Sequence, residues 1–146
     1  MTERVAEVLA VEGIGPFLEG QSGRLLAIAS SSDREWLDSS LERLGLRHHF
    51  GDRVFSAAGI ERGKPHPDVY LMVAGALGVS PSKCLVIEDH PVGVAAGAAA
   101  GMTVIGLLAA GHIRPGHDAR VRSAGARHVA RDYPQVAEIL EELERF

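Results

Sequence analysis

VIEDHPVGVAAGAAAGMTVIG, residues 86–106, combines a pair of adjacent carboxylates with a long uncharged segment. The apolar residues before Glu88 and Asp89 predict a strand that is buried on both faces, as in a parallel sheet. The Ala- and Gly-rich residues after the pair predict a helix, and Gly101 separates this helix from a second apolar strand at residues 103–107. A strand, a helix and a strand in this order are typical of a parallel sheet that is covered by helices.

The uncharged segment, residues 92–111, is also long enough to cross a membrane as a helix. Gly93, Gly97 and Gly101 have the spacing that membrane helices use for close packing. The segment is rich in Ala and Gly rather than in Leu, Ile or Phe, however, so its insertion into a bilayer would be poorly favoured. We therefore predict a helix and a strand in a soluble core, where the glycines let the helix lie close to the sheet.

The rest of the chain repeats the same alternation of strands and helices. An apolar run at residues 25–29 predicts a strand that leads to Ser30, and residues 32–35, Ser-Asp-Arg-Glu, have the pattern of a capping box that opens a helix. The sequence therefore predicts an α/β fold, a Rossmann-like three-layer domain with a parallel sheet, over residues 25–146. The further strands are expected at residues 53–56, 84–87, 103–107 and 127–130, the further helices at 67–77 and from 134 onward, and a loop at 109–119.

Composition excludes several classes of function. The net charge is −4 and the basic residues are scattered, which argues against a nucleic-acid partner. The single cysteine, Cys84, rules out an internal disulfide and fits a reducing compartment. The first residues lack a basic segment followed by a long apolar core, so we expect no signal peptide, no membrane partner and a cytoplasmic location.

Reactive side chains are expected to meet at one edge of the predicted sheet. Ser30, Glu88 and Asp89 follow strands, and Lys64 lies in the loop Gly63-Lys64-Pro65. In open parallel sheets, ligands bind beyond the carboxyl ends of the strands. Two carboxylates suit a hard cation such as Mg²⁺, and a lysine with a hydroxyl suits a phosphate. The sequence therefore predicts a site for a phosphorylated ligand and Mg²⁺.

Three segments together resemble the haloacid dehalogenase (HAD) superfamily, close to the β-phosphoglucomutases and phosphoglycolate phosphatases. The segments are LLAIASSS at 25–32, GKPHPDVY at 63–70 and VIEDHPVGVAAGAAAGM at 86–102, and the resemblance covers about residues 13–140. The resemblance implies a HAD-like core that acts as a phosphatase-type hydrolase. Its substrate would be a small phosphomonoester, that is, a small phosphorylated metabolite. It also implies the site residues: Ser30, Ser31 and Lys64 for phosphate, with Lys64 also neutralising the nucleophile, and Glu88 and Asp89 for Mg²⁺.

One motif of the family is missing. The family carries its nucleophile in an Asp-x-Asp motif on a strand between those that end here in Ser30 and Glu88, and no two Asp residues of this chain are two positions apart. Loss of the strand that carries this motif would leave the two neighbouring strands with unpaired backbone groups. We expect an N-terminally truncated core, with residues 1–24 as a remnant of a cap or linker. A strand supplied by Val5–Val11 or by a partner chain is an alternative, which would make a homodimer or strand exchange a fair hypothesis.

The missing nucleophile also leaves the activity open. The alternatives to a phosphatase are a non-catalytic module that binds phosphate or metal, and a phosphomutase, since phosphatases and mutases share these motifs. Phosphate esters hydrolyse extremely slowly without a catalyst, so a phosphate site without its nucleophile would bind the ligand and leave it intact.

The sequence also allows predictions for several histidines. His90 follows the carboxylates and fits either a contact with substrate or a solvent-facing loop. His48 and His49 are expected at the surface, and the spacing of His112 and His117 matches no zinc pattern.

Overall fold

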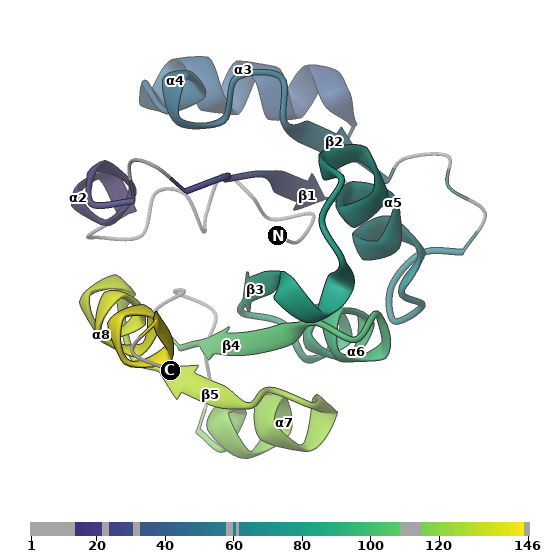
Figure 1. Cartoon of the computed structure of the whole chain (residues 1–146), viewed down its shortest axis with the longest axis vertical. Helices are drawn as coiled ribbons and strands as arrows, with labels where there is room; N and C mark the ends of the chain where they lie inside the picture. The colour runs from purple at the N-terminus through teal and green to yellow at the C-terminus, as the bar shows by residue number, and fades with distance from the viewer. Residues whose placement is uncertain are drawn as a thin grey trace.

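The computed structural model describes residues 14–21, 24–30, 33–57, 60, 62–108 and 115–144, in which strands and helices alternate (Figure 1). The strands are β1 (Ile28–Ser30), β2 (Val54–Ser56), β3 (Leu85–Glu88), β4 (Thr103–Leu107) and β5 (His128–Ala130). The helices are α2 (Ile14–Glu19), α3 (Arg34–Leu44), α4 (Arg47–Phe50), α5 (Asp68–Leu77), α6 (Pro91–Ala99), α7 (His117–Ala124) and α8 (Tyr133–Glu144), with a 3-10 turn at Pro81–Lys83.

All strand pairs are parallel, which confirms the predicted α/β class. Strand β1 pairs with β2, with Ile28 opposite Val54, and β4 pairs with β3 on one side and β5 on the other. The described strands therefore form two ladders, one of two strands and one of three. No described residue hydrogen-bonds β1 to β3, the two strands that face each other across the division.

Helices cover both faces of the strands, as the three-layer prediction requires. Helices α2 and α8 lie on one side in Figure 1, and α5 and α6 lie on the other. Successive strand residues point to opposite faces, so Ile105 joins the apolar cluster under α2, α3 and α8, and Val104 joins the cluster under α5, α6 and α7. Both side chains are fully buried. Neither apolar cluster is confined to one ladder.

A cavity of about 410 Å³ separates the two ladders. Its walls include Ala27 and Ile28 at β1, and Val86 and Ile87 of β3. Phe17 of α2 closes part of the same space. Its lining is predominantly apolar, and the facing edges of two parallel strands border it. The resemblance to the HAD superfamily predicts the strand with the Asp-x-Asp motif at this position, between the strands that end in Ser30 and Glu88.

Several element boundaries differ from the sequence prediction. The strand expected at 25–29 begins only at Ile28, because its partner β2 begins opposite that residue. Helix α3 is capped by Asp33, whose carboxylate accepts a hydrogen bond of 2.9 Å from the backbone N–H of Trp36, and Ser32 of the proposed capping box lies outside the described residues. Helix α7 begins within the loop predicted at 109–119.

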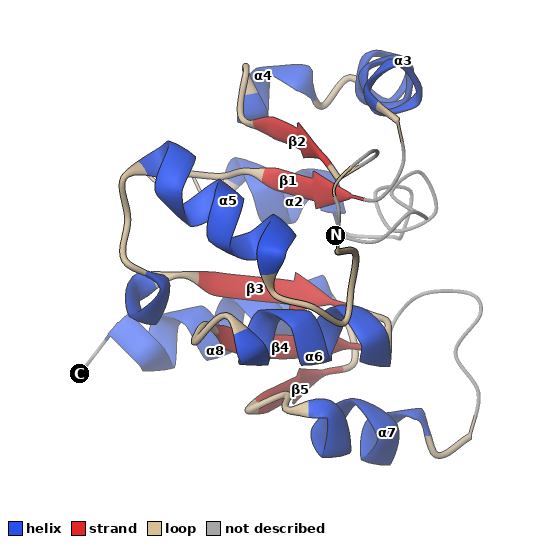
Figure 2. Cartoon of the chain, turned by 90° about the vertical axis from the view of Figure 1, so that its right-hand side faces the viewer, coloured by secondary structure: helices blue, strands red, loops and turns tan. Residues whose placement is uncertain are grey.

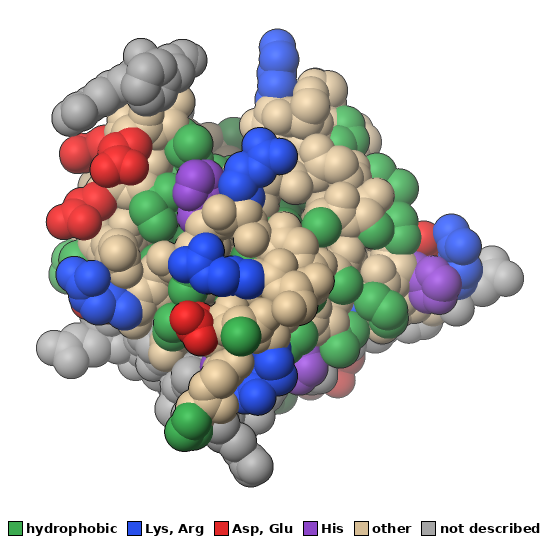
Figure 3. Space-filling view, turned by 90° about the horizontal axis from the view of Figure 1, so that it is seen from below, with side chains coloured by type: hydrophobic (Ala, Val, Ile, Leu, Met, Phe, Trp, Pro, Cys, Tyr) green, Lys and Arg blue, Asp and Glu red, His purple; other side chains and the backbone are tan. Residues whose placement is uncertain are grey.

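The uncharged segment forms a helix and a strand, as predicted. Helix α6 ends before Gly101, which has a φ of 83°, and β4 follows at the expected residues. Among the described residues, no helix combines the length and the apolar character that crossing a bilayer requires. Figure 3 shows the molecule from below, where Lys and Arg side chains are scattered among apolar, neutral and acidic surface and form no continuous basic patch on this face.

Gly97 lets α6 lie directly on the sheet. A Cβ atom at this position would lie 2.8 Å from Cγ2 of Val104 and 3.5 Å from Cγ2 of Val86. Both valines are buried, so neither can move away freely. The helix-to-sheet distance therefore depends on a residue without a side chain.

Replacing Gly97 by alanine is expected to destabilise the protein by about 1–3 kcal/mol, because the added methyl group overpacks the core. Gly75 of α5 is the matched control, since a Cβ there would meet no atom within 4 Å. Gly75→Ala is expected to stabilise the protein by about 0.5–1 kcal/mol through helix propensity alone. Urea unfolding of both variants measures the difference, and effects of the same sign would contradict close packing of α6 on β4.

Candidate active site

The predicted site residues lie at the carboxyl ends of the strands. Ser30 ends β1 and Glu88 ends β3, and the arrows of the two strands point the same way in Figure 2. Both residues are almost completely buried, with 0% and 2% of their surface exposed. Asp89 follows Glu88 and is 1% exposed. Polar groups so deeply buried require partners, because an unpaired charge in the interior is costly.

Glu88 is held by two side chains from the preceding loop and helix. The Nζ atom of Lys64 lies 3.3 Å from Oε2 of Glu88, and the hydroxyl of Tyr70 donates to the same oxygen at 3.0 Å. The side chains of Lys64 and Glu88 are only 5% and 0% exposed. Nζ of Lys64 also lies 5.1 Å from the centre of the Tyr70 ring, within range of a cation–π contact. The three side chains form a buried network.

The backbone after β3 holds the other oxygen of Glu88. The N–H groups of Asp89 and His90 donate to Oε1 at 3.1 and 3.2 Å. Gly93 leaves room for this arrangement, because a Cβ at that position would lie 2.2 Å from Oε2 of Glu88. The first turn of α6 thus wraps around the carboxylate, and the sequence Glu-Asp-His-Pro-Val-Gly encodes both the charge and the space for it.

The electrostatic state of the two carboxylates differs. Burial acts to raise the pKa of Glu88, but the Lys64 ammonium and the hydrogen bonds to the carboxylate act against burial, and this pKa lies below its ordinary value. Burial, together with the negative charge of Glu88, raises the pKa of Asp89 to about 7. Burial and Glu88 also raise the pKa of the Tyr70 hydroxyl well above 10. Glu88 is therefore the ionised acid of the pair, and Tyr70 remains a hydrogen-bond donor.

These residues fit a divalent cation. Asp89, whose pKa is raised, is buried beside the ionised Glu88. A positive charge at this point would therefore relieve the repulsion between the two carboxylates. Carboxylate oxygens are the ligands that Mg²⁺ prefers. Lys64 already neutralises Glu88, which leaves Asp89 as the better candidate for binding a cation.

The structure brings together most of the residues singled out in the sequence. Lys64, Glu88 and Asp89 adjoin one another, and Ser30 lies at the same edge of the strands. Ser31, predicted to bind phosphate, lies outside the described residues. His90 caps α6, where its Nδ1 accepts a hydrogen bond from the N–H of Val92 at 3.3 Å.

Two residues near the carboxylates were not predicted from the sequence. Tyr70 lies six residues after Lys64, on the helix that follows the lysine loop, and a signal was available in the pattern Lys-x-x-x-x-x-Tyr of GKPHPDVY. His117 begins α7, is 7% exposed, and its Nε2 lies 2.6 Å from the backbone oxygen of Asp89. No local pattern signals His117, because only the fold brings α7 beside the end of β3.

Comparison with known proteins identifies the class to which this fold and site belong. The family model of haloacid dehalogenase-like hydrolases matches residues 4–101. The chain therefore belongs to the haloacid dehalogenase-like hydrolases, as the three motifs predicted.

Two of the curated relatives are phosphatases by name. Fructose-1-phosphate phosphatase YqaB of Escherichia coli is 39% identical over 82 residues, which are 56% of this chain and 43% of that protein. The 6-phosphogluconate phosphatase of the same organism is 29% identical over 110 residues, 75% of this chain and 49% of that protein. The chain thus spans less than half the length of these curated relatives.

Solved structures give the same fold. A haloacid dehalogenase-like protein of unknown function from Agrobacterium tumefaciens superposes with a TM-score of 0.85 at 33% identity, covering 92% of this chain and 61% of that one. A HAD family hydrolase from Deinococcus radiodurans, solved with bound phosphate and sodium, gives a TM-score of 0.81 at 38% identity, covering 90% and 59%.

Asp89→Asn is expected to stabilise the protein near pH 8 in the absence of divalent cations. The folded protein holds the proton of Asp89 up to a pKa of about 7, against an ordinary value of 3.8. The stability that this gives is complete below the ordinary value and is lost as the pH rises through about 7. Ionised Asp89 therefore costs up to about 4 kcal/mol at high pH, and asparagine removes this cost.

Urea unfolding at about pH 4 and pH 8 with a chelator present measures this effect. The gain should be large at the higher pH and small at the lower pH. Asp52→Asn, at an exposed turn residue, is the matched control and should change neither value appreciably. A loss of stability in Asp89→Asn near pH 8 would mean that the carboxylate is stabilised rather than strained by its surroundings.

Proposed function

We propose that this chain forms the phosphate- and metal-binding part of a Mg²⁺-dependent phosphomonoesterase that acts on a small phosphorylated metabolite. The observation that carries the proposal is the buried network of Lys64, Glu88 and Tyr70 beside Asp89. It places a cation and an acidic pair at the carboxyl edge of parallel strands, where α/β proteins bind ligands. The phosphatase relatives and the phosphate bound in the Deinococcus structure support this reading.

The proposed roles follow from charge. Ser30 and Lys64 bind the phosphate, the first as a hydroxyl at the end of β1 and the second as a cation. Asp89, with Glu88, binds Mg²⁺, which neutralises charge on the phosphoryl oxygens when it is bound. With Lys64, Glu88 and Asp89 all charged, the site carries one net negative charge. A divalent cation makes the site positive and therefore receptive to a phosphate dianion.

The nucleophile is the part of the machinery that the printed sequence does not contain, since it has no Asp-x-Asp. We propose that a strand bearing this motif belongs in the cavity between β1 and β3, where it would pair with both open edges. Its carboxyl end would then lie between Ser30 and Glu88. The two separate ladders and the apolar lining of the cavity support this placement.

A binding module without turnover is the second candidate, and the missing Asp-x-Asp favours it. A phosphomutase is a further alternative, because a β-phosphoglucomutase from Clostridium difficile has the same fold at 27% identity and a TM-score of 0.70. The homodimer or strand exchange, and the cytoplasmic location, stay predictions.

Lys64→Ala is expected to weaken the binding of inorganic phosphate in the presence of Mg²⁺ by about tenfold or more, because a hydrogen bond to a charged group is lost. Calorimetric titration measures the affinity. Lys83→Ala is the matched control, since Lys83 is the only other lysine and lies before β3 at the opposite end of the strand.

Ser30→Ala provides a second variant in case loss of Lys64 leaves Glu88 buried without its cation and the chain fails to fold. It removes one hydroxyl and keeps the charge network. Circular dichroism establishes that each variant is folded before titration. Phosphate affinity that is unchanged in both folded variants would reject the proposed phosphate site.

Turnover is expected to require an added nucleophile. The 146-residue chain should not hydrolyse an aryl phosphate, whereas the same chain extended at its N-terminus by an apolar strand ending in Asp-x-Asp should do so with Mg²⁺. The extension with its first Asp replaced by Asn is the matched control and should be inactive. Mg²⁺-dependent hydrolysis by the unextended chain, abolished by Asp89→Asn, would show that a nucleophile lies within residues 1–146.

A further inference from the structure

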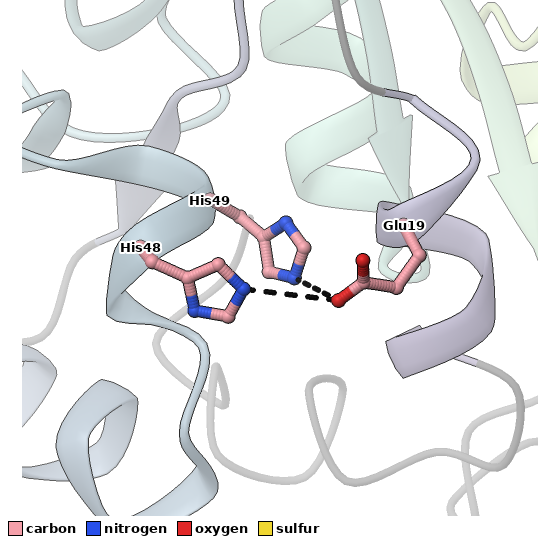
Figure 4. A group of neighbouring side chains, drawn as sticks. All are labelled: Glu19, His48 and His49. Carbon is pink, nitrogen blue, oxygen red and sulfur yellow. Dashed lines mark ion pairs between the residues drawn. The ribbon is translucent and has the colours of Figure 1, made fainter.

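We propose that Glu19, His48 and His49 form a second metal site, which binds a divalent transition-metal ion of the Zn²⁺ class (Figure 4). One oxygen of Glu19 and one ring nitrogen of each histidine can be chosen so that all three atoms lie within 4.8 Å of one another. The residues come from α2 and α4, which are separate in the sequence. The sequence prediction assigned His48 and His49 to the surface without a role.

The distances suit a common metal ligand set. Nε2 of His49 lies 3.4 Å and Nε2 of His48 lies 3.7 Å from the same oxygen, Oε1 of Glu19. Ligand atoms around a tetrahedral Zn²⁺ with bonds of about 2.0–2.1 Å are roughly 3.3–3.4 Å apart. Figure 4 shows both rings directed toward the carboxylate. The distance from Nε2 of His49 already matches this spacing, and that from Nε2 of His48 exceeds it by about 0.3 Å.

The chemistry of the donors selects the ion. Two imidazoles and one carboxylate bind Zn²⁺, Ni²⁺ or Cu²⁺, whereas Mg²⁺ requires oxygen ligands. Three protein ligands leave a fourth position for water. His49, whose side chain is 10% exposed, is fixed by its surroundings, and the exposed His48 and Glu19, at 66% and 71%, are free to adjust to the ion.

This cluster is separate from the candidate active site. Helix α2 precedes the amino end of β1, and α4 precedes the amino end of β2. Ser30 and Glu88 lie at the carboxyl ends of their strands. The two sites are therefore at opposite edges of the strands, and neither shares a residue with the other.

An ion bound here would connect the two ladders through α2. Phe17 of α2 packs on Tyr133 of α8, with ring centres 5.2 Å apart, and α8 covers the three-stranded ladder. Glu19 faces α4, which leads into β2 of the two-stranded ladder. Metal binding at Glu19, His48 and His49 would therefore fix α2 to both parts of the fold and stabilise the folded state by mass action.

Calorimetric titration of Zn²⁺ into the full 146-residue chain tests the proposal. Millimolar Mg²⁺ is present throughout, so that the carboxylates of the candidate active site are occupied. One Zn²⁺ per chain is expected. Glu19→Gln and His48→Ala should each weaken binding by at least about tenfold, since losing even an outer-shell partner of a metal ligand costs that much.

Two matched controls separate the cluster from general surface binding. Glu35→Gln and His66→Ala remove an exposed glutamate and an exposed histidine elsewhere, and both should keep the wild-type Zn²⁺ affinity. Asp89→Asn should keep it as well, because Asp89 belongs to the other site. This comparison also distinguishes failure of the second metal site from failure of the proposed phosphatase function.

Two further readouts report on coordination and stability. Cu²⁺ bound at the cluster should give an electron paramagnetic resonance spectrum with coupling to two imidazole nitrogens. Zn²⁺ should raise the melting temperature of the wild-type chain and leave that of Glu19→Gln almost unchanged. Absence of Zn²⁺ binding by the folded wild-type chain, or equal binding by the Glu19→Gln/His48→Ala double variant, would overturn the proposal and leave two ordinary surface ion pairs.

Discussion

The buried carboxylate of Glu88 is the constraint on which the rest of the site depends. A charge at the end of a buried strand is tolerated only when donors surround it, and the donors to Glu88 include Nζ of Lys64, the hydroxyl of Tyr70 and two backbone N–H groups. These donors fix the lysine loop, the start of α5 and the first turn of α6 against the end of β3. The same carboxylate requires Gly93 beside it. One acidic residue thereby sets the positions of three segments.

Sequence reasoning predicted the α/β class and the strand and helix around Gly101, because burial and glycine spacing are local signals. It also placed Lys64 and Glu88 at one edge, since parallel strands bring their carboxyl ends together. It missed the contact of His117 with Asp89 and the approach of Glu19 to His48, because these depend on how distant helices pack. The boundary of β1 was wrong for a similar reason: the strand extends only as far as its partner β2.

Within the described residues, helices and not strand pairing hold the two ladders together. Helix α5 contacts both β1 and α6, and α2 contacts α8 while lining the cavity between β1 and β3. Hydrophobic packing can join two ladders, but it is less directional than backbone hydrogen bonds. The relative position of Ser30 and Glu88 therefore rests on side-chain packing in the described part of the chain, although each residue is fixed firmly within its own ladder.

The division into two ladders also bears on the order in which the chain folds. Strands β1 and β2 are joined through α3 and α4, and β3 and β4 through α6, so each ladder closes through a short crossover of its own. Contacts between residues close in sequence cost less chain entropy than distant ones, and they form faster. We therefore expect the two βαβ segments to form early, and their docking through α5 and α2 to be the slow, long-range step.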